Sequence, residues 1–387
     1  MRQVFRKIPV YTGDVSGVCS ALFELGGMVV MHDPSGCNST YNTHDEIRWY
    51  DHDSLIFISG LNEMEAIMGS DEDLIRDITE SARIYSPGFI AIANSPIPYI
   101  TGMDFDAISR LVEEETGIPT FYITTNGMHD YTRGAGLAFR QLAENFVTEP
   151  ALIDKPALTD RSLRCNILGM TPLDFAAAAS VDSLRSKVEA AGFEIVSCWA
   201  MGDDLEGIRK SAMADVNLVV SSSGLAAARY MFRKFGIPFT AGFPAEGTEE
   251  VYFEAVTRAV QTGENQFPFR DRREPVNDTL PVCFIGEPVI MTSLAAQAEE
   301  RTGAPTYVFG ATEGADVFLG PKDAALCGEE ELEEALGKLG RTKVVADPYY
   351  KDVLPAGCEL ISLPHLAFSG RILLNEIPDL FRLIIDL

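Results

Sequence analysis

Short apolar runs that alternate with amphipathic stretches of helical length constrain the fold of this chain more than any other feature. Most of these runs lack the in–out alternation of half-exposed strands, which is typical of strands covered on both faces. Several helical stretches end at glycine, and GIP or GAP then leads into the next run. This order predicts an α/β fold of parallel sheets with helices on both faces. The predicted strands span residues 27–31, 54–59, 88–93, 119–124, 164–170, 193–199, 217–221, 237–241, 281–285, 305–309, 343–346 and 359–363.

Two segments rich in proline and charged residues, 149–163 and 261–280, interrupt this rhythm. Such a composition is typical of linkers. The chain has 387 residues, more than one hydrophobic core usually serves. The sequence therefore predicts three α/β domains, which span residues 1–155, 156–275 and 276–387.

The chain is strongly acidic, with 31 Lys and Arg residues against 57 Asp and Glu residues and a formal charge of −26. Because this charge repels phosphate, nucleic acid is not an expected partner. No apolar run reaches the about 18 residues of a membrane span, and the first residues lack the apolar core of a signal peptide. The seven cysteines are widely spaced without a C-x-x-C pair, which indicates a reducing compartment. We therefore expect a cytoplasmic protein without membrane contact.

Several common site motifs are absent from the sequence. No G-x-G-x-x-G follows a predicted strand, and no G-x-x-x-x-G-K-[ST] or G-x-S-x-G occurs. Their absence disfavours NAD binding, an ATP site in this chain and a common hydrolase. In open α/β sheets, ligands bind instead where the carboxyl ends of strands meet helix N-termini. Two histidines, His129 in NGMHDYTRG and His365 in LPHLAFSG, lie in such loops and are candidates for ligand contact.

Cys37 stands out by its position in the stretch HDPSGC, after a predicted strand and where a helix would begin. The positive end of a helix stabilises a thiolate, the form that ligates metals. From the residues alone, Cys37 is an inert thiol, a zinc ligand or an iron–sulfur ligand. The spacing of the nearby histidines disfavours zinc, because His32, His44 and His52 lack the usual ligand pattern.

The other cysteines are less informative. Cys19 lies in the helix-like GVCSALFEL, so its side chain either shares the neighbourhood of Cys37 or is buried in the core. Free cysteines in apolar runs behave as small hydrophobic residues. We expect three cysteines of this kind in the core: Cys165, Cys198 and Cys283.

A strand followed by DPSGC at a helix start resembles the H-G-P-x-G-C element of nitrogenase component 1 type oxidoreductases. Further stretches resemble elements of that family in the same order along nearly the whole chain, namely NSPIPYITGMDFDAISR, TTNGMHDYTRGAGLAFRQ, VNLVVSSSGLAAARYMFRKFGIPFTAGF and LPHLAFSG. The resemblance implies three Rossmann-like domains and a [4Fe–4S] cluster at a subunit interface. It also implies electrons from a separate P-loop ATPase that carries its own iron–sulfur cluster. Some members hold a metallocluster or a tetrapyrrole substrate between the domains, and the short chain is similar to the tetrapyrrole-reducing members.

The family's ligands for the interfacial cluster carry over unevenly. Cys37 matches the cysteine of the G-C turn, whereas Ser95 stands where the family has a second cysteine. The most upstream family cysteine would fall near residues 12–14, which leaves Cys19 as a displaced candidate. A [4Fe–4S] cluster needs four soft ligands. A homodimer could supply Cys19 and Cys37 twice across a two-fold axis, and a paralogous heterodimer is the other arrangement that the resemblance allows.

The ligands of the family's larger metallocluster carry over only in part. Ser221 aligns with the cysteine of the second domain, and His365 falls near the family histidine, although its surrounding loop is one residue shorter. Without the second-domain thiolate, a nitrogenase proper is not expected.

Two functions remain open at this stage. The first is an oxidoreductase component that binds a small-molecule or tetrapyrrole substrate among Ser95, His129, Ser221 and His365, with loop residues Glu246 and Glu313 as candidate proton donors. The second is a non-catalytic ligand- or cofactor-binding scaffold that has lost the cluster, in which the SSSG and TTNG loops would suit an anion. A periplasmic-type binding protein is disfavoured, because no signal peptide is expected.

Overall fold

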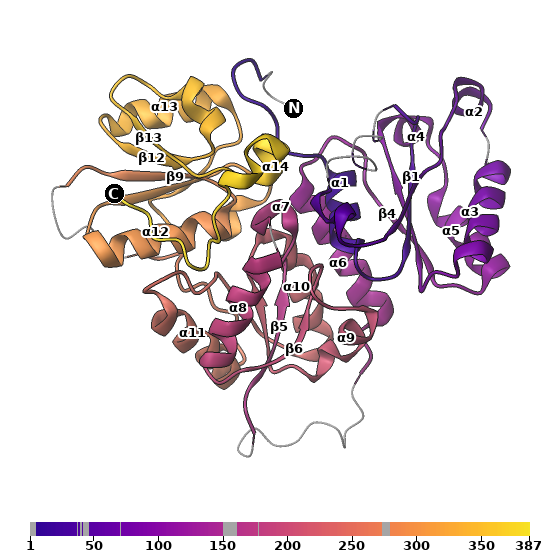
Figure 1. Ribbon diagram of the computed structural model, residues 1–387, viewed down its shortest axis with the longest axis horizontal. Coiled ribbons are helices and arrows are strands. Elements are labelled where there is room, and N and C mark those ends of the chain that lie inside the picture. Colours follow the sequence, from indigo (N-terminus) through magenta and orange to yellow (C-terminus); the bar gives the residue numbers. More distant parts are fainter. Residues whose placement is uncertain are drawn as a thin grey trace.

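The computed structural model describes residues 5–36, 38, 41, 46–69, 71–149, 161–176, 178–272 and 279–387. It contains three parallel β-sheets with helices packed on them, which form three lobes (Figure 1). We call each sheet with its helices a unit, numbered in chain order. The α/β fold predicted from the sequence is confirmed. The two predicted domain boundaries, near residues 155 and 275, lie outside the described residues and stay predictions.

The first unit contains a four-stranded sheet of order β2-β1-β3-β4. Its strands alternate between two cores: Val29 and Met31 contact one cluster, and Met28 and Val30 contact the other. Helices therefore cover both faces, which explains the continuous apolar runs in the sequence. The elements are α1 (Asp14–Leu22), β1 (Met28–His32), β2 (Leu55–Ile58), α2 (Glu63–Met68), α3 (Asp71–Tyr85), β3 (Ile90–Asn94), α4 (Pro96–Thr101), α5 (Phe105–Thr116), β4 (Thr120–Ile123) and α6 (Tyr131–Phe146).

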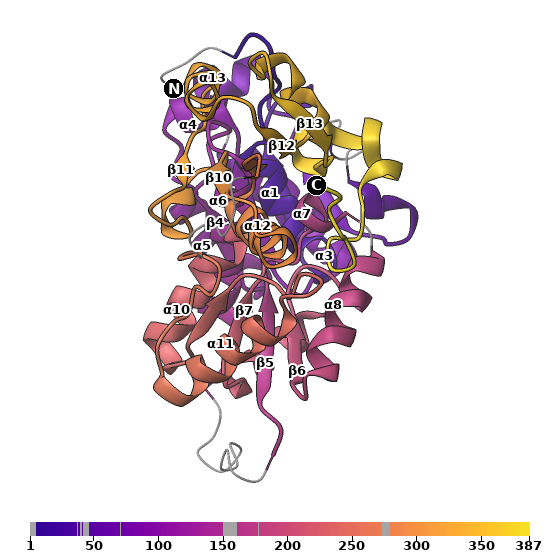
Figure 2. The same ribbon diagram turned by 90° about the vertical axis from the view of Figure 1, so that its left-hand side faces the viewer.

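The second unit repeats this strand order as β6-β5-β7-β8. In both sheets, the chain order reverses between the first and third strands, which creates a crevice at their carboxyl ends. The elements are β5 (Arg164–Leu168), α7 (Pro172–Phe175), α8 (Ala178–Ala190), β6 (Glu194–Cys198), α9 (Leu205–Arg209), β7 (Val216–Val219), α10 (Leu225–Phe235), β8 (Phe239–Ala241) and α11 (Glu249–Thr262). Figure 2 shows this unit at the bottom of the molecule, below the other two.

The third unit has a five-stranded sheet of order β11-β10-β9-β12-β13, whose crevice lies between β9 and β12. Its elements are β9 (Val282–Gly286), α12 (Pro288–Thr302), β10 (Thr306–Gly310), β11 (Ala324–Ala325), α13 (Glu329–Leu339), β12 (Lys343–Ala346), β13 (Glu359–Ser362) and α14 (Leu366–Ser369). Short 3₁₀ turns complete the described chain at Ile47–Tyr50, Lys210–Met213, Ser222–Gly224, Ala315–Val317, Pro348–Val353 and Gly370–Glu376.

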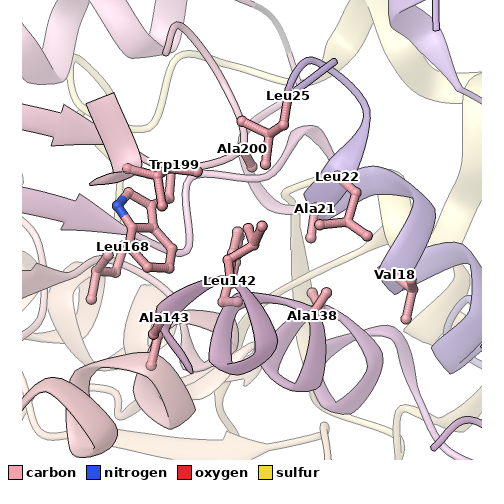
Figure 3. Packing of buried hydrophobic residues seen from close by; sticks show 14 of the residues in the cluster. Val18, Ala21, Leu22, Leu25, Ala138, Leu142, Ala143, Leu168, Trp199 and Ala200 are labelled. Atoms are coloured by element: carbon pink, nitrogen blue, oxygen red, sulfur yellow. The ribbon is translucent and has the colours of Figure 1, made fainter. Parts of the chain in front are cut away.

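Helix α6 lies between α1 and the second unit, so these units share one core. Figure 3 shows Leu142 of α6 between Leu22 of α1 on one side and Leu168 and Trp199 of the second unit on the other. The approach of α1 to α6 is so close that a side chain at Gly134 would collide with the backbone of Asp14. Glycine is therefore required at that crossing.

Both ends of the described chain cross between units. The N-terminal segment, residues 5–13, packs on the third unit before α1 begins in the first, and Figure 1 shows it beside α13 and α14. One oxygen of Glu329 accepts the backbone N–H groups of Arg6, Lys7 and Ile8 at 2.7–3.0 Å. The C-terminal segment, residues 377–387, returns from the third unit to the second, where Phe381 stacks on Phe175. Each segment thus joins two units.

The cysteines expected in the core, Cys165, Cys198 and Cys283, are all fully buried. Among the described residues, no helix is both long and apolar enough to span a membrane.

Candidate functional site

The crevices of the second and third sheets face each other, and their loops are hydrogen-bonded directly. The backbone N–H of Ser222, after β7, donates to Oε1 of Glu287, after β9, at 2.8 Å. Oε2 of Glu287 accepts the N–H of Ile290 at 2.8 Å, which caps α12. An acceptor at this position and a proline next to it, here Pro288, are a usual helix start. The local sequence GEPV therefore fixes a carboxyl group where the two units meet.

A second carboxyl group, that of Asp174, comes from α7, the short helix that follows β5. Thr171 and Pro172 begin α7, and the hydroxyl of Thr171 donates to Oδ2 of Asp174 at 3.1 Å. The hydroxyl of Tyr131, at the start of α6, donates to Oδ1 at 2.5 Å. Asp174 and Tyr131 are both buried. The first and second units thus meet at this carboxyl group.

His365 completes the group from the third unit. Its backbone N–H donates to Oδ2 of Asp347, after β12, at 2.8 Å, and its Nε2 lies 3.4 Å from Oδ1 of Asp174. The ring is 7% exposed, and neither ring nitrogen makes a hydrogen bond within the described part of the chain. Tyr11 of the N-terminal segment packs its ring edge-on against the imidazole, 5.8 Å between centroids. We call Tyr131, Asp174, Glu287 and His365 the junction group.

Burial dominates the electrostatics of the junction group. Burial, and after it the charge of the nearby Asp174, raise the pKa of Glu287 to about 7, against the two backbone N–H groups that lower it. Burial and Asp174 also raise the pKa of Tyr131 well above its usual value. In the described part of the chain, no lysine or arginine forms an ion pair with Asp174 or Glu287. The group therefore concentrates negative charge in an apolar setting.

A cavity of about 450 Å³ lies beside the junction group. Its walls come from the N-terminal segment, Pro172 and Leu173 of α7, residues 366–371 including α14, and Glu46. Tyr11 lines the cavity, and its ring also contacts that of His365. The volume lies in the range of small-molecule sites.

The residues that the sequence singled out are divided between this junction and other places. Ser221 is fully buried close to the junction, where its hydroxyl donates to the carbonyl of Gly169 at 2.8 Å. His365 belongs to the junction group. Ser95 instead lies at the crevice of the first sheet, where it is buried near Asp33. His129 is partly exposed and pairs with Glu313 across 2.8 Å.

The predicted cluster ligands are not assembled within the described residues. Cys37 and His44 lie outside the described residues. Cys19 is fully buried in the core around α1 and α6, and burial raises the pKa of its thiol, which disfavours the thiolate. Burial has the opposite effect on a histidine and lowers the pKa of His32 to about 4. The Nδ1 atom of His32 lies 2.8 Å from the hydroxyl oxygen of Ser59.

Across the described ranges, no group of three or more His, Cys, Asp and Glu side chains could hold a metal ion. A buried thiol at Cys19 and a hydroxyl at Ser95 do not fit a [4Fe–4S] cluster, which needs four soft ligands.

Asp174 and Glu287 were not among the predicted site residues, which included two other carboxylates. Glu246 pairs with Lys187 at 2.9 Å and Glu313 with His129, and both are more than 40% exposed. The signal for Asp174 and Glu287 was an acidic residue at the helix start that directly follows the first strand of a sheet. Those positions are where the crevice of such a sheet forms.

The fold and the site define a protein of three Rossmann-like units with a buried polar group where all three meet. The chain belongs to the nitrogenase component 1 type oxidoreductase family, whose sequence profile matches residues 16–261. Two solved structures, titled nitrogenase Cp1 at pH 5 and at pH 6.5, share the fold with TM-scores of 0.58 at 16% identity. They match over 86% and 82% of this chain, and over 72% and 64% of their own chains.

Two kinds of curated relative match about half of the chain. The nitrogenase iron-molybdenum cofactor biosynthesis protein NifE of Methanosarcina barkeri is 23% identical over 190 residues, 47% of this chain and 40% of that protein. A subunit of the light-independent protochlorophyllide reductase of Prosthecochloris aestuarii is 26% identical over 162 residues, 41% of this chain and 29% of that protein. The chain thus spans less than half the length of each of these relatives.

Proposed function

We propose that this chain is the substrate-binding component of a nitrogenase-like reductase. It binds a small molecule beside the junction group and receives electrons from a separate P-loop ATPase that carries an iron–sulfur cluster. The observation that supports this proposal is His365, a buried imidazole with no hydrogen bond from either ring nitrogen to a described residue, beside a cavity of about 450 Å³. A buried polar group without a partner is costly, and a bound ligand would supply the partner.

The residues around His365 have defined roles in this proposal. Asp347 fixes the backbone of His365, and Asp174 lies against Nε2, so together they orient the imidazole. Tyr131 holds Asp174 from the opposite unit. The surrounding core excludes water, which strengthens each polar contact with a ligand. The relative that is named a protochlorophyllide reductase component favours a tetrapyrrole as the substrate class.

Electron entry is the part of the proposal that rests on the family resemblance. A [4Fe–4S] cluster at an interface with a second chain would supply one-electron redox chemistry, with Cys37 as a ligand from this chain. The second chain, identical or paralogous, would complete the set. The described residues do not fit that cluster, because the thiol of Cys19 is buried and position 95 carries a hydroxyl.

A second candidate function is a non-catalytic scaffold that carries a cofactor or its precursor between the units. Burial of Cys19 and the serine at position 95 favour it, since both reduce the thiolates available for a cluster. The relatives that are named cofactor biosynthesis proteins favour it as well. The scaffold would use the same ligand site as the reductase, but it would not need to receive electrons.

Iron and sulfide analysis of the anaerobically purified and reconstituted full chain separates the two functions. The reductase proposal expects iron and an EPR signal after one-electron reduction in the wild type, lost in Cys37→Ala and retained in Cys165→Ala, a matched variant in the core. Both functions require the ligand site. Titration with a metal-free and with a nickel tetrapyrrole, monitored by absorption spectroscopy, tests it. An iron-free chain that binds tetrapyrrole in a His365-dependent way supports the scaffold. A chain with neither iron nor ligand contradicts both functions.

A further inference from the structure

Two charged side chains, Glu46 and Arg371, are found among the described residues that line the cavity of about 450 Å³. Protein donors engage both carboxylate oxygens of Glu46. Its Oε1 accepts the Nε–H of Arg48 at 2.9 Å, and its Oε2 accepts the hydroxyl of Tyr41 and a second N–H of Arg48, both at 3.0 Å. Glu46 therefore stabilises the wall of the cavity, and Arg371 is the charged side chain of this lining that suits a ligand.

Arg371 extends from the third unit to the first. It belongs to the 3₁₀ turn Gly370–Glu376, and its Nη2 donates to the hydroxyl of Tyr50 at 3.4 Å. The guanidinium also lies 5.7 Å from the centre of the Tyr50 ring, and Tyr50 is 75% exposed. A guanidinium has five N–H donors, so Arg371 can bind a ligand while it keeps its contacts within the protein.

Most of the other lining residues are apolar or aromatic. Leu173 and Ala367 belong to one buried apolar cluster, and Tyr11 packs against it. An apolar wall with a single cation suits a molecule that has an apolar body and one anionic group. The formal charge of −26 repels anions from the chain as a whole, so a small inorganic anion without an apolar body would gain little from this site.

We propose that Arg371 binds a carboxylate of an apolar, ring-containing molecule held in this cavity. The planar fork of a guanidinium matches the two oxygens of a carboxylate. This inference deepens the proposed function and rests on it for the occupant, a tetrapyrrole whose carboxyl groups are free. Arg371 fixes the edge of the ligand that faces the third unit, and it selects the free acid over neutral esters and amides.

Calorimetric titration of the isolated full chain with 2-naphthoate and with 2-naphthamide tests this role, because the two probes share one ring system and differ in charge. We expect the wild type to bind naphthoate about tenfold or more tightly than naphthamide, since a hydrogen bond to a charged group contributes that factor. Arg371→Met should abolish the difference and leave naphthamide binding unchanged. Arg371→Lys, which keeps the charge without the planar fork, should restore part of it. Arg382→Met, at an arginine with a side chain 74% exposed and paired with Asp379, should behave as the wild type.

The wild type alone can overturn the proposal, either by equal affinities for the two probes or by no binding of naphthoate. Naphthoate binding that Arg371→Met leaves intact would overturn it as well. Tighter binding of 2-naphthyl phosphate than of naphthoate would overturn the assignment of a carboxylate.

The naphthalene probes are not tetrapyrroles, so their binding stands apart from the proposed function. If the wild type and Arg371→Met bind coproporphyrin III, a tetrapyrrole with free carboxyl groups, equally tightly, the role of Arg371 is contradicted and the proposed function is retained. A chain that prefers naphthoate through Arg371 but binds no tetrapyrrole and no iron retains the role of Arg371 and contradicts only the proposed function.

Discussion

Replacing Arg48 by methionine tests how the first unit is fixed to the second. The guanidinium is buried and donates to Oε1 of Glu46 at 2.9 Å and to Oε1 of Glu24 at 3.0 Å. It also donates to the carbonyls of Ser20, at 2.7 Å, and Ala200, at 3.0 Å, and the second of these lies in the other unit. One side chain therefore satisfies acceptors in both units.

The expected loss in the free energy of unfolding for Arg48→Met is about 3–5 kcal/mol. This is the usual cost of removing one partner of a buried ion pair, because Glu46 would remain as an unpaired charge with a side chain 2% exposed. The double variant Arg48→Met with Glu46→Gln removes that charge too, and we expect it to recover more than about 1 kcal/mol. Urea unfolding followed by far-UV circular dichroism measures both values.

Arg140→Met provides the matched control. Arg140 pairs with Glu144 on the exposed side of α6, with 48% of its side chain exposed, so its loss should change the free energy by less than about 1 kcal/mol. Two results would refute the reasoning about Arg48. One is a loss below about 1 kcal/mol for Arg48→Met, and the other is a double variant no more stable than the single one.

Further predictions concern the thiol, the N-terminal segment, an interface pair and pH. Cys19→Ala should keep the iron-to-protein ratio of the wild type and lose about 1 kcal/mol of stability, whereas lost iron would make Cys19 a ligand. Glu329→Ala removes the acceptor of three backbone N–H groups, so hydrogen exchange at residues 6–8 should accelerate roughly tenfold or more, and unchanged exchange would contradict this. His129→Ala should change the free energy of unfolding by less than about 1 kcal/mol, because its pair with Glu313 is partly exposed, and calorimetry would detect a larger effect. Because the pKa of Glu287 is raised in the folded state, from 4.5 to about 7, its contribution to stability is complete below pH 4.5 and is lost as the pH rises through about 7. The loss amounts to about 3 kcal/mol, so Glu287→Gln should flatten the pH dependence of the unfolding free energy between these limits, and an unchanged slope would contradict the assignment.

The fold was predictable because the sequence pattern is local and strong. Continuous apolar runs between helices that end at glycine were sufficient for the α/β class, and ordered motifs such as DPSGC were sufficient for the family. Strand β11, Ala324–Ala325, was not predicted, since two residues are too short to show a pattern. The repeated strand order of the first two sheets also follows from long-range pairing, which no local pattern specifies.

The site was predictable only in outline, for a related reason. The loops SSSG and LPHLAFSG were recognised as candidates, and Ser222 of the first is hydrogen-bonded to Glu287, a residue that was not among the predicted site residues. Which crevices face each other depends on how the units pack, and that packing is spread over the shared cores. Asp174 therefore could not be distinguished from an ordinary helix-start residue until Tyr131 and His365, 43 and 191 positions away in the numbering, were seen beside it.

The attachment of the N-terminal segment to Glu329 has a consequence for biosynthesis. Residues 6–8 are synthesised well before their acceptor, which lies in the third unit. At about 5–20 residues per second, roughly 15–65 s separate the synthesis of the two partners. During that interval the segment is tethered only to the first unit, and Tyr11 cannot yet cover His365. Tyr11 can therefore take its place against His365 only after the third unit has been made.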